Sequence, residues 1–118
     1  MATLATTGIA FLADVIGDAF SYVRVGTGTT AESAAHTGLV TEITAMAAQA
    51  TITVESDSIT VWTVTLTYDA TRALREVALY TLSTGGTMFL RHLWATARNG
   101  DVGDTLTLTF KMTNAQGA

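Results

Sequence analysis

The stretch ITVWTVTLTY, residues 59–68, decides the fold class. Hydroxyl and apolar side chains alternate along it. Because successive side chains of a strand point to opposite faces of a sheet, this alternation predicts a strand with one face in the core and the other in polar surroundings. The β-branched and aromatic residues that fill most of the stretch also favour strands. The predicted core face carries Trp62, Val64, Leu66 and Tyr68, and the opposite face carries Thr63, Thr65 and Thr67.

Further strands are predicted on both sides of this stretch. Residues 105–112, TLTLTFKM, alternate more cleanly than any other segment. Residues 74–82 and 87–96 form two more strands, joined by a Ser-Thr-Gly-Gly segment whose glycines suit a tight hairpin. With shorter patterns at 21–28 and 50–56, the sequence predicts an all-β protein. Its expected architecture is an antiparallel β-sandwich, or a jelly-roll-like fold, of six to eight strands.

Two segments lack a clear strand pattern. Residues 1–8, MATLATTG, are small and uncharged, and they are predicted to form a flexible N-terminal arm. A single β domain is expected over residues 9–118. Between residues 29 and 50 alanine and glutamate favour helix, but Gly38 argues against one continuous helix. The sequence therefore predicts a loop followed by one short helical segment around residues 39–46.

The composition restricts the classes of function. A chain of 118 residues is enough for one domain, and the lack of cysteine excludes disulfides, cysteine-based zinc sites and thiol nucleophiles. The net charge of −4, with six Lys and Arg, argues against a nucleic-acid-binding surface. Charged residues make up 14%, against the usual quarter or so. Such a chain has few charges to keep an isolated surface soluble, which favours a protein that works within an assembly.

The same composition bears on two further points: the pairing of a sheet edge with another subunit, and the presence of a membrane-spanning or signal segment. The chain contains no proline, which removes one common means of protecting sheet edges and favours pairing of an edge with another subunit. Its apolar runs fall short of the roughly 20 residues that a membrane-spanning helix needs. No basic region precedes the apolar residues 9–20, as it would in a signal peptide. We therefore expect a soluble protein without a membrane partner.

No group of residues resembles a catalytic site. His36 lies in an alanine-rich loop and is expected to be solvated, while His92 lies in a predicted strand, where a sheet or interface role is simpler. The acidic pairs lack the further oxygen ligands that calcium requires. We expect no enzymatic activity, cofactor, metal or small-molecule substrate. The acidic pairs are Asp14 with Asp18, Glu55 with Asp57, and Asp101 with Asp104.

Glu76 is the charged residue of most structural interest. It lies in the middle of a predicted strand, where a lone buried carboxylate would be costly. If the hairpin turns at Thr84-Gly85, Arg91 falls opposite Ala78, on the same face as Glu76 and diagonal to it. The sequence thus predicts a structural ion pair between Glu76 and Arg91.

The aromatic residues are most simply core or interface anchors. Several of them fall on predicted apolar faces, which supports this interpretation over a platform for stacking sugars. These residues are Trp62, Tyr68, Tyr80, Phe89, Trp94 and Phe110.

Three motifs follow the threonine-rich strand. Residues 74–80 read LREVALY, Gly85-Gly86 precede a return strand with Arg91, and residues 103–109 read GDTLTLT. Together with VGTGTTAESAAHTGLVTEI at residues 25–43, this pattern resembles small structural proteins of tailed bacteriophages. The resemblance covers roughly residues 22–113. One departure is Ala78, which stands where those proteins usually have glycine.

The resemblance implies a non-enzymatic structural protein of the virion. Within that class we favour a capsid decoration (cement) protein that binds across neighbouring major capsid protein subunits, as a homotrimer on the capsid surface, after synthesis in the host cytoplasm. The N-terminal arm would contact the shell or a neighbouring subunit. The residues assigned to that interface are Ala2, Thr3, Leu4, Thr6 and Thr7.

Two alternatives remain open at this point. The first is a tail, collar or fibre component, because the motifs do not separate these from decoration proteins. The second is a carbohydrate- or receptor-binding β module, which would expose Trp62 or Trp94 as a stacking surface.

Overall fold

The computed structural model describes residues 15–55 and 59–113, and the expected arm at residues 1–8 lies outside these ranges. The described residues form seven strands and a short helical segment at residues 15–19. The strands are β1 (Tyr22–Gly26), β2 (Glu42–Gln49), β3 (Thr51–Glu55), β4 (Ile59–Thr67), β5 (Arg72–Tyr80), β6 (Met88–Gly100) and β7 (Thr105–Thr113).

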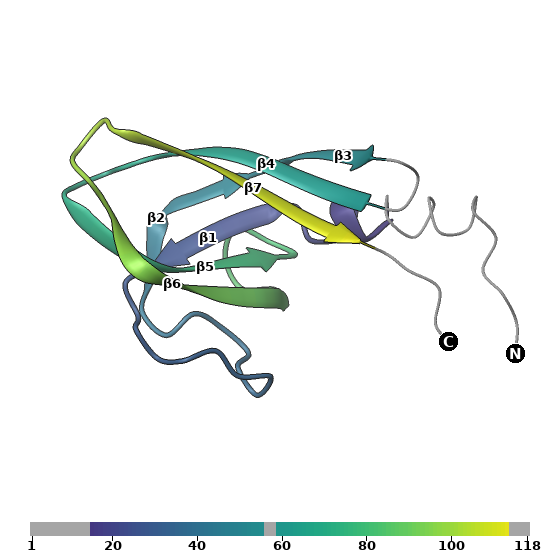
Figure 1. The fold of residues 1–118 in the computed structure, drawn as a ribbon, viewed down its shortest axis with the longest axis horizontal. Helices are drawn as coiled ribbons and strands as arrows, with labels where there is room; N and C mark the ends of the chain where they lie inside the picture. The colour runs from purple at the N-terminus through teal and green to yellow at the C-terminus, as the bar shows by residue number, and fades with distance from the viewer. Residues whose placement is uncertain (1–14, 56–58, 114–118) are drawn as a thin grey trace, which may run out of the picture.

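The strands form two antiparallel sheets that enclose one core (Figure 1). One sheet has four strands in the order β2-β1-β5-β6, and the other has three in the order β3-β4-β7. The predicted all-β antiparallel sandwich is therefore confirmed, and its seven strands fall within the expected six to eight. The sheets differ by one strand, so β6 has no counterpart beside β7 among the described residues.

The alternation of residues 59–68 produces the burial that it predicts. Trp62, Val64, Leu66 and Tyr68 are buried, while the threonines between them are exposed. β4 lies at the centre of the three-stranded sheet, where both edges of its backbone are paired. In β7 the same alternation leaves the apolar face only half-buried, because β7 lies at the edge of its sheet.

The hairpin between β5 and β6 follows the predicted register. Gly85 and Gly86 in its turn have φ of 64° and 72°, the left-handed region that glycine adopts without steric cost. Ala78 pairs with Arg91, as expected. Further along, Leu74 pairs with Arg98 and Glu76 with Leu93, so extra residues of β6 bulge out opposite Arg75. Arg75 Nε donates to the Trp94 carbonyl oxygen in this bulge, at 3.0 Å.

The predicted helical turns at residues 39–46 are wrong, because this segment runs into strand β2. Pairing with β1 supplies the backbone hydrogen bonds of β2 and outweighs the helical preference of its alanines. Ile43 and Met46 are both buried although they are three residues apart, which is a helical spacing. A break in the register opposite Arg24 explains it, since a bulge there turns both side chains inward. The short helical segment lies instead at residues 15–19.

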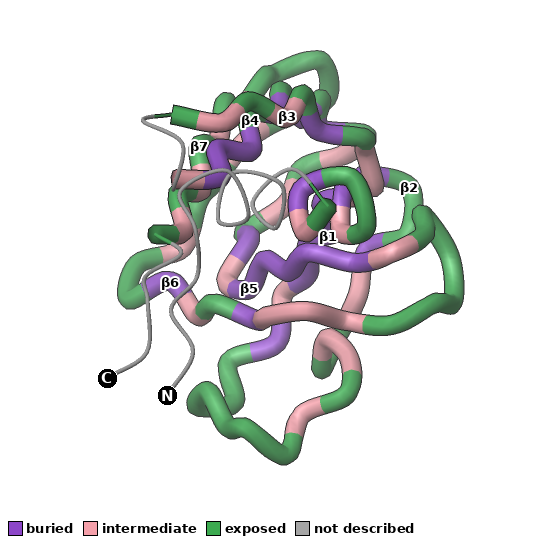
Figure 2. The backbone as a smooth tube through the Cα atoms, turned by 90° about the vertical axis from the view of Figure 1, so that its right-hand side faces the viewer, coloured by how far each residue is buried: buried purple, intermediate pink, exposed green. Residues whose placement is uncertain are grey.

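The core lies between the two sheets, and Figure 2 shows buried stretches of β1 and β5 inside a shell of exposed loops. One long side is closed because Ala50 alone separates β2 from β3. One end is closed where the Tyr68 hydroxyl donates to the Arg98 carbonyl oxygen at 2.7 Å. At the other end Phe20 stacks on Phe89, with ring centroids 4.5 Å apart. On the remaining long side, between β6 and β7, a pocket lies among the described residues.

Gly100→Ala should destabilise the protein by roughly 1 to 3 kcal/mol, the usual range for overpacking. A Cβ at this position would lie 2.6 Å from atoms of the Tyr68 ring, which its hydroxyl hydrogen bond holds in place. Urea unfolding measures the loss. Asn99→Ala, at the exposed neighbouring position, is the control and should stay within about 0.5 kcal/mol of wild type. Equal stability of the two variants would contradict this account of the closed end.

Candidate binding site at the open side of the sandwich

Glu76 lies on the face of β5 that points away from the core, and its side chain is completely buried. The loop at residues 27–41 covers it; this is the dark blue loop below β1 and β5 in Figure 1. Glu76 Oε1 accepts hydrogen bonds from the Val40 amide at 2.9 Å and from Arg91 Nε at 2.8 Å. Oε2 accepts from the amides of Gly28 at 2.9 Å and Thr41 at 2.7 Å. Four donors thus surround one carboxylate.

These donors determine the charge state of Glu76. Burial by itself would raise the pKa of the carboxyl group. The hydrogen bonds from Arg91 and the three loop amides favour the carboxylate form and outweigh burial, so the pKa of Glu76 lies below its ordinary value. Glu76 therefore holds the loop as a carboxylate.

Arg91 is the partner that the sequence assigned to Glu76, and the structure brings the two together. Only 2% of the Arg91 side chain is exposed, and the pair is the most buried one among the described residues. The two terminal nitrogens of Arg91 are buried and have no hydrogen-bond partner in the described part of the chain. The charge of Arg91 is thus compensated mainly by Glu76.

A second buried arginine, which the sequence reasoning missed, lies beside this pair. Arg24 binds both carboxylate oxygens of Glu42 at 2.6 Å, and its guanidinium lies 3.6 Å from the centroid of the Tyr80 ring. The hydrogen bond to Glu42 raises the pKa of Arg24 despite its burial. The Tyr80 hydroxyl in turn accepts from the Leu39 amide at 3.0 Å. The only sequence signal for this buried arginine is that Arg24 lies between two valines of a short strand.

The loop at residues 27–41 and the buried charges form one unit on the outer face of the four-stranded sheet. This loop therefore gives the sheet a second covered face, so β1 and β5 are buried on both sides. Such a sheet is a rigid support for the surfaces at its edge.

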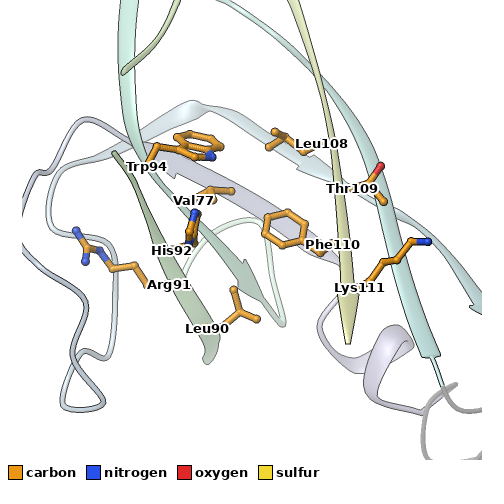
Figure 3. A pocket seen from close by; sticks show the side chains of 9 residues that line it. All are labelled: Val77, Leu90, Arg91, His92, Trp94, Leu108, Thr109, Phe110 and Lys111. Carbon is orange, nitrogen blue, oxygen red and sulfur yellow. The ribbon is translucent and has the colours of Figure 1, made fainter. Parts of the chain in front are cut away.

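A groove of about 480 Å³ lies at the open side, between β6 and β7 (Figure 3). Leu90, His92 and Trp94 approach it from β6, and Leu108 and Phe110 approach it from β7. Arg91 also borders it, but its side chain extends to the other side of β6. Of the four apolar side chains only Trp94 is buried, so the groove exposes apolar surface.

The two strand edges that border the groove differ. β6 carries the bulge opposite Arg75, and its Leu93 amide donates to Glu32 Oε1 at 2.8 Å. β7 pairs with β4 at nine consecutive positions without a bulge, and its other edge faces no described strand. A regular unpaired edge beside apolar surface is a template for another strand.

The outer face of the three-stranded sheet is a threonine ladder. Three pairs of exposed threonines face one another across β4 and β7, and the hydroxyls of Thr65 and Thr107 lie 3.2 Å apart. This face offers hydroxyl groups with few charges. The pairs are Thr63 with Thr109, Thr65 with Thr107, and Thr67 with Thr105.

The remaining candidates do not form a reactive centre. His36 is half-buried in the loop rather than fully solvated, and His92 Nδ1 lies 3.1 Å from Glu32 Oε1 at the surface. Glu55 pairs with Lys111, and the Asp101 amide donates to Asp104 in a polar turn. The described residues include no cluster of three His, Cys, Asp or Glu side chains suited to a metal. Asp14, Asp57 and the assigned interface residues Ala2, Thr3, Leu4, Thr6 and Thr7 lie outside the described ranges.

The aromatic residues are mostly anchors, as predicted. Trp62 is fully buried and Trp94 is 8% exposed, so neither offers the open stacking surface that the alternative of a carbohydrate-binding module requires. Trp62 Nε1 donates to the Phe20 carbonyl oxygen at 3.0 Å, which explains how an indole is buried without loss of its hydrogen bond.

Comparisons with protein-family models, with curated proteins and with solved structures gave no match for this chain. Among the described residues, no helix has the length and apolar character needed to span a membrane.

Glu76→Gln should lower the free energy of unfolding by roughly 3 to 5 kcal/mol, because it leaves the buried Arg91 charge without its partner. Urea or thermal unfolding measures the loss. Glu55→Gln is the matched control, since it breaks an ion pair whose side chains are about half exposed and should cost at most about 1 kcal/mol. Equal losses would contradict a central role for Glu76.

Acid should weaken the protein through the same carboxylate. In the unfolded chain Glu76 titrates near the ordinary value of about 4.3, and its pKa in the folded state is lower. Its stabilisation is therefore complete above about pH 4.3 and is lost as the pH falls through the folded-state pKa. Unfolding free energies measured between about pH 7 and pH 3 should fall more steeply for wild type than for Glu76→Gln. Parallel curves would show that Glu76 does not contribute.

Proposed function

We propose that this chain is a non-enzymatic structural protein of a tailed-bacteriophage particle, and that it serves as a capsid decoration protein. The observation that carries the proposal is the groove between β6 and β7, where apolar side chains lie half-exposed beside a strand edge that no described strand pairs with. Soluble monomers seldom expose such a surface without a use for it. The motif resemblance over residues 22–113 supplies the kind of assembly.

Two further features support a role in contacts between subunits. The threonine ladder offers hydroxyls for polar contacts on a face with few charges. The loop at residues 27–41 is anchored by a buried carboxylate and is fixed before any partner binds. A surface that is ordered in advance loses little conformational entropy on binding.

The proposed mechanism is mechanical. A decoration protein that binds only the assembled shell, across neighbouring major capsid subunits, stabilises that shell by its own binding free energy. In this proposal the groove joins copies of the protein into a trimer, and the threonine ladder contacts the shell. No bond is made or broken, so the stabilisation depends on surface complementarity and copy number.

Cosedimentation tests the proposal. Purified protein is mixed with separated capsids and with separated tails of the phage that encodes it. Saturable binding to capsids at many copies per shell is expected, together with greater resistance of the shell to heat. Binding to tails alone would replace the decoration role with a tail, collar or fibre role, and binding to neither would overturn the proposal.

A matched pair of variants makes this test specific. Thr107→Lys adds a charge to the middle of the threonine ladder, on an exposed side chain, and should weaken capsid binding at least about tenfold. Thr29→Lys, at an exposed position of the loop that covers the four-stranded sheet, should leave capsid binding unchanged. Equal binding by both variants would exclude the ladder as the contact surface.

A further inference from the structure

The four-stranded sheet has one strand more than the sheet it faces, and the groove lies where the missing strand would run. A strand added to the edge of β7 that no described strand occupies would become the fourth strand of this sheet, after β3, β4 and β7. It would also cover Leu90 and Trp94 on the inner face of β6. The sandwich would then have four strands in each sheet.

The structure also distinguishes between the two edges. An added strand on β6 would have to displace Glu32 from the Leu93 amide and follow the bulge opposite Arg75. β7 needs neither change, because its pairing with β4 is regular over nine residues. β7 is therefore the edge that accepts a strand.

We propose that the strand comes from a second copy of this chain, from the stretch MATLATTGIAFLA at residues 1–13. The stretch has no charged side chain, which suits an apolar groove. In an extended strand Ile9 and Phe11 share one face, with the period that inserts alternate side chains into a groove. Thirteen extended residues reach about 43 Å, enough to match the nine residues of β7 and leave a link.

The position of residue 15 favours donation between copies. The helical segment at residues 15–19 lies at the end of the three-stranded sheet where β7 finishes, since a Cβ at Gly17 would meet Ile52 of β3 and Thr60 of β4, and Thr60 pairs with Met112. β7 also runs toward that end (Figure 1). A strand that leads into residue 15 and pairs with β7 of the same copy would have to run parallel to β7, whereas every described pairing is antiparallel. A second copy can supply an antiparallel strand.

This contact is heterologous, because each copy donates one strand and accepts another. Such contacts close into a ring when the rotation between copies allows it, so a trimer can form without a free groove. The inference rests on the proposed function in one respect only: it takes the copies joined by this contact to be copies of a decoration protein. Self-association of the purified protein is measured without capsids, so the two proposals can fail separately.

Complementation between two full-length variants tests the inference. Phe110→Asp places a charge in the accepting groove, and Phe11→Asp places one in the donated stretch. Sedimentation should show wild type as an oligomer and each variant alone with at least about tenfold weaker association. An equal mixture should form one-to-one dimers, because the intact donor stretch of Phe110→Asp then meets the intact accepting edge of Phe11→Asp. Thr63→Asp, on the exposed face of β4 and outside the groove, is the matched control and should associate like wild type.

A second pair of variants guards against misfolding, with circular dichroism to check each protein. Leu108→Asp replaces the acceptor variant and Ile9→Asp the donor variant, and the mixture should again associate. A monomeric wild type, or mixtures that stay monomeric when all variants are folded, would overturn the inference. Restored association without capsid binding would leave the strand exchange standing and remove the decoration role. Capsid binding without restored association would leave the decoration role standing and remove the strand exchange.

Discussion

The rest of the structure depends on the buried carboxylate of Glu76. It joins three amides of the loop at residues 27–41 to a strand at the centre of the four-stranded sheet, and it compensates Arg91 across the hairpin. Four hydrogen-bond donors offset the free-energy cost of burying this carboxylate. Removing any one of them leaves part of that cost uncompensated and destabilises the fold. The loop, the hairpin and the outer face of the sheet are therefore one cooperative unit rather than three separate features.

This unit explains why the proposed contacts lie at an edge of the sandwich. Both faces of the central strands β1 and β5 are covered, one by the core and the other by the loop, so these strands offer little surface to a partner. One long side of the sandwich is closed by the short link between β2 and β3. What remains is the side where β6 and β7 diverge, together with the threonine ladder on the thinner sheet. The proposed contacts use these two surfaces.

Much of the fold follows from local patterns in the sequence. Period-two alternation identified β4 and β7, and the double glycine fixed a hairpin register that placed Arg91 opposite Ala78. The helical turns at residues 39–46 were wrong because a bulge gives Ile43 and Met46 a helical spacing within a strand. The amide donors to Glu76 and the pairing of Arg24 with Glu42 could not be predicted, since they join segments far apart in the chain. The groove depends on the unequal number of strands, which no local pattern encodes.

The anchoring of the loop has a consequence for sequence divergence. Glu76 is bound by main-chain amides at Gly28, Val40 and Thr41, and every residue type except proline supplies an amide. Only at Gly28 would a side chain interfere, because a Cβ there would lie 2.6 Å from Glu76 Oε2. The exposed positions 29–35 between these anchors, apart from Glu32 with its bond to the Leu93 amide, can therefore change while the loop keeps its place. Relatives of this chain could present different surfaces on one constant support.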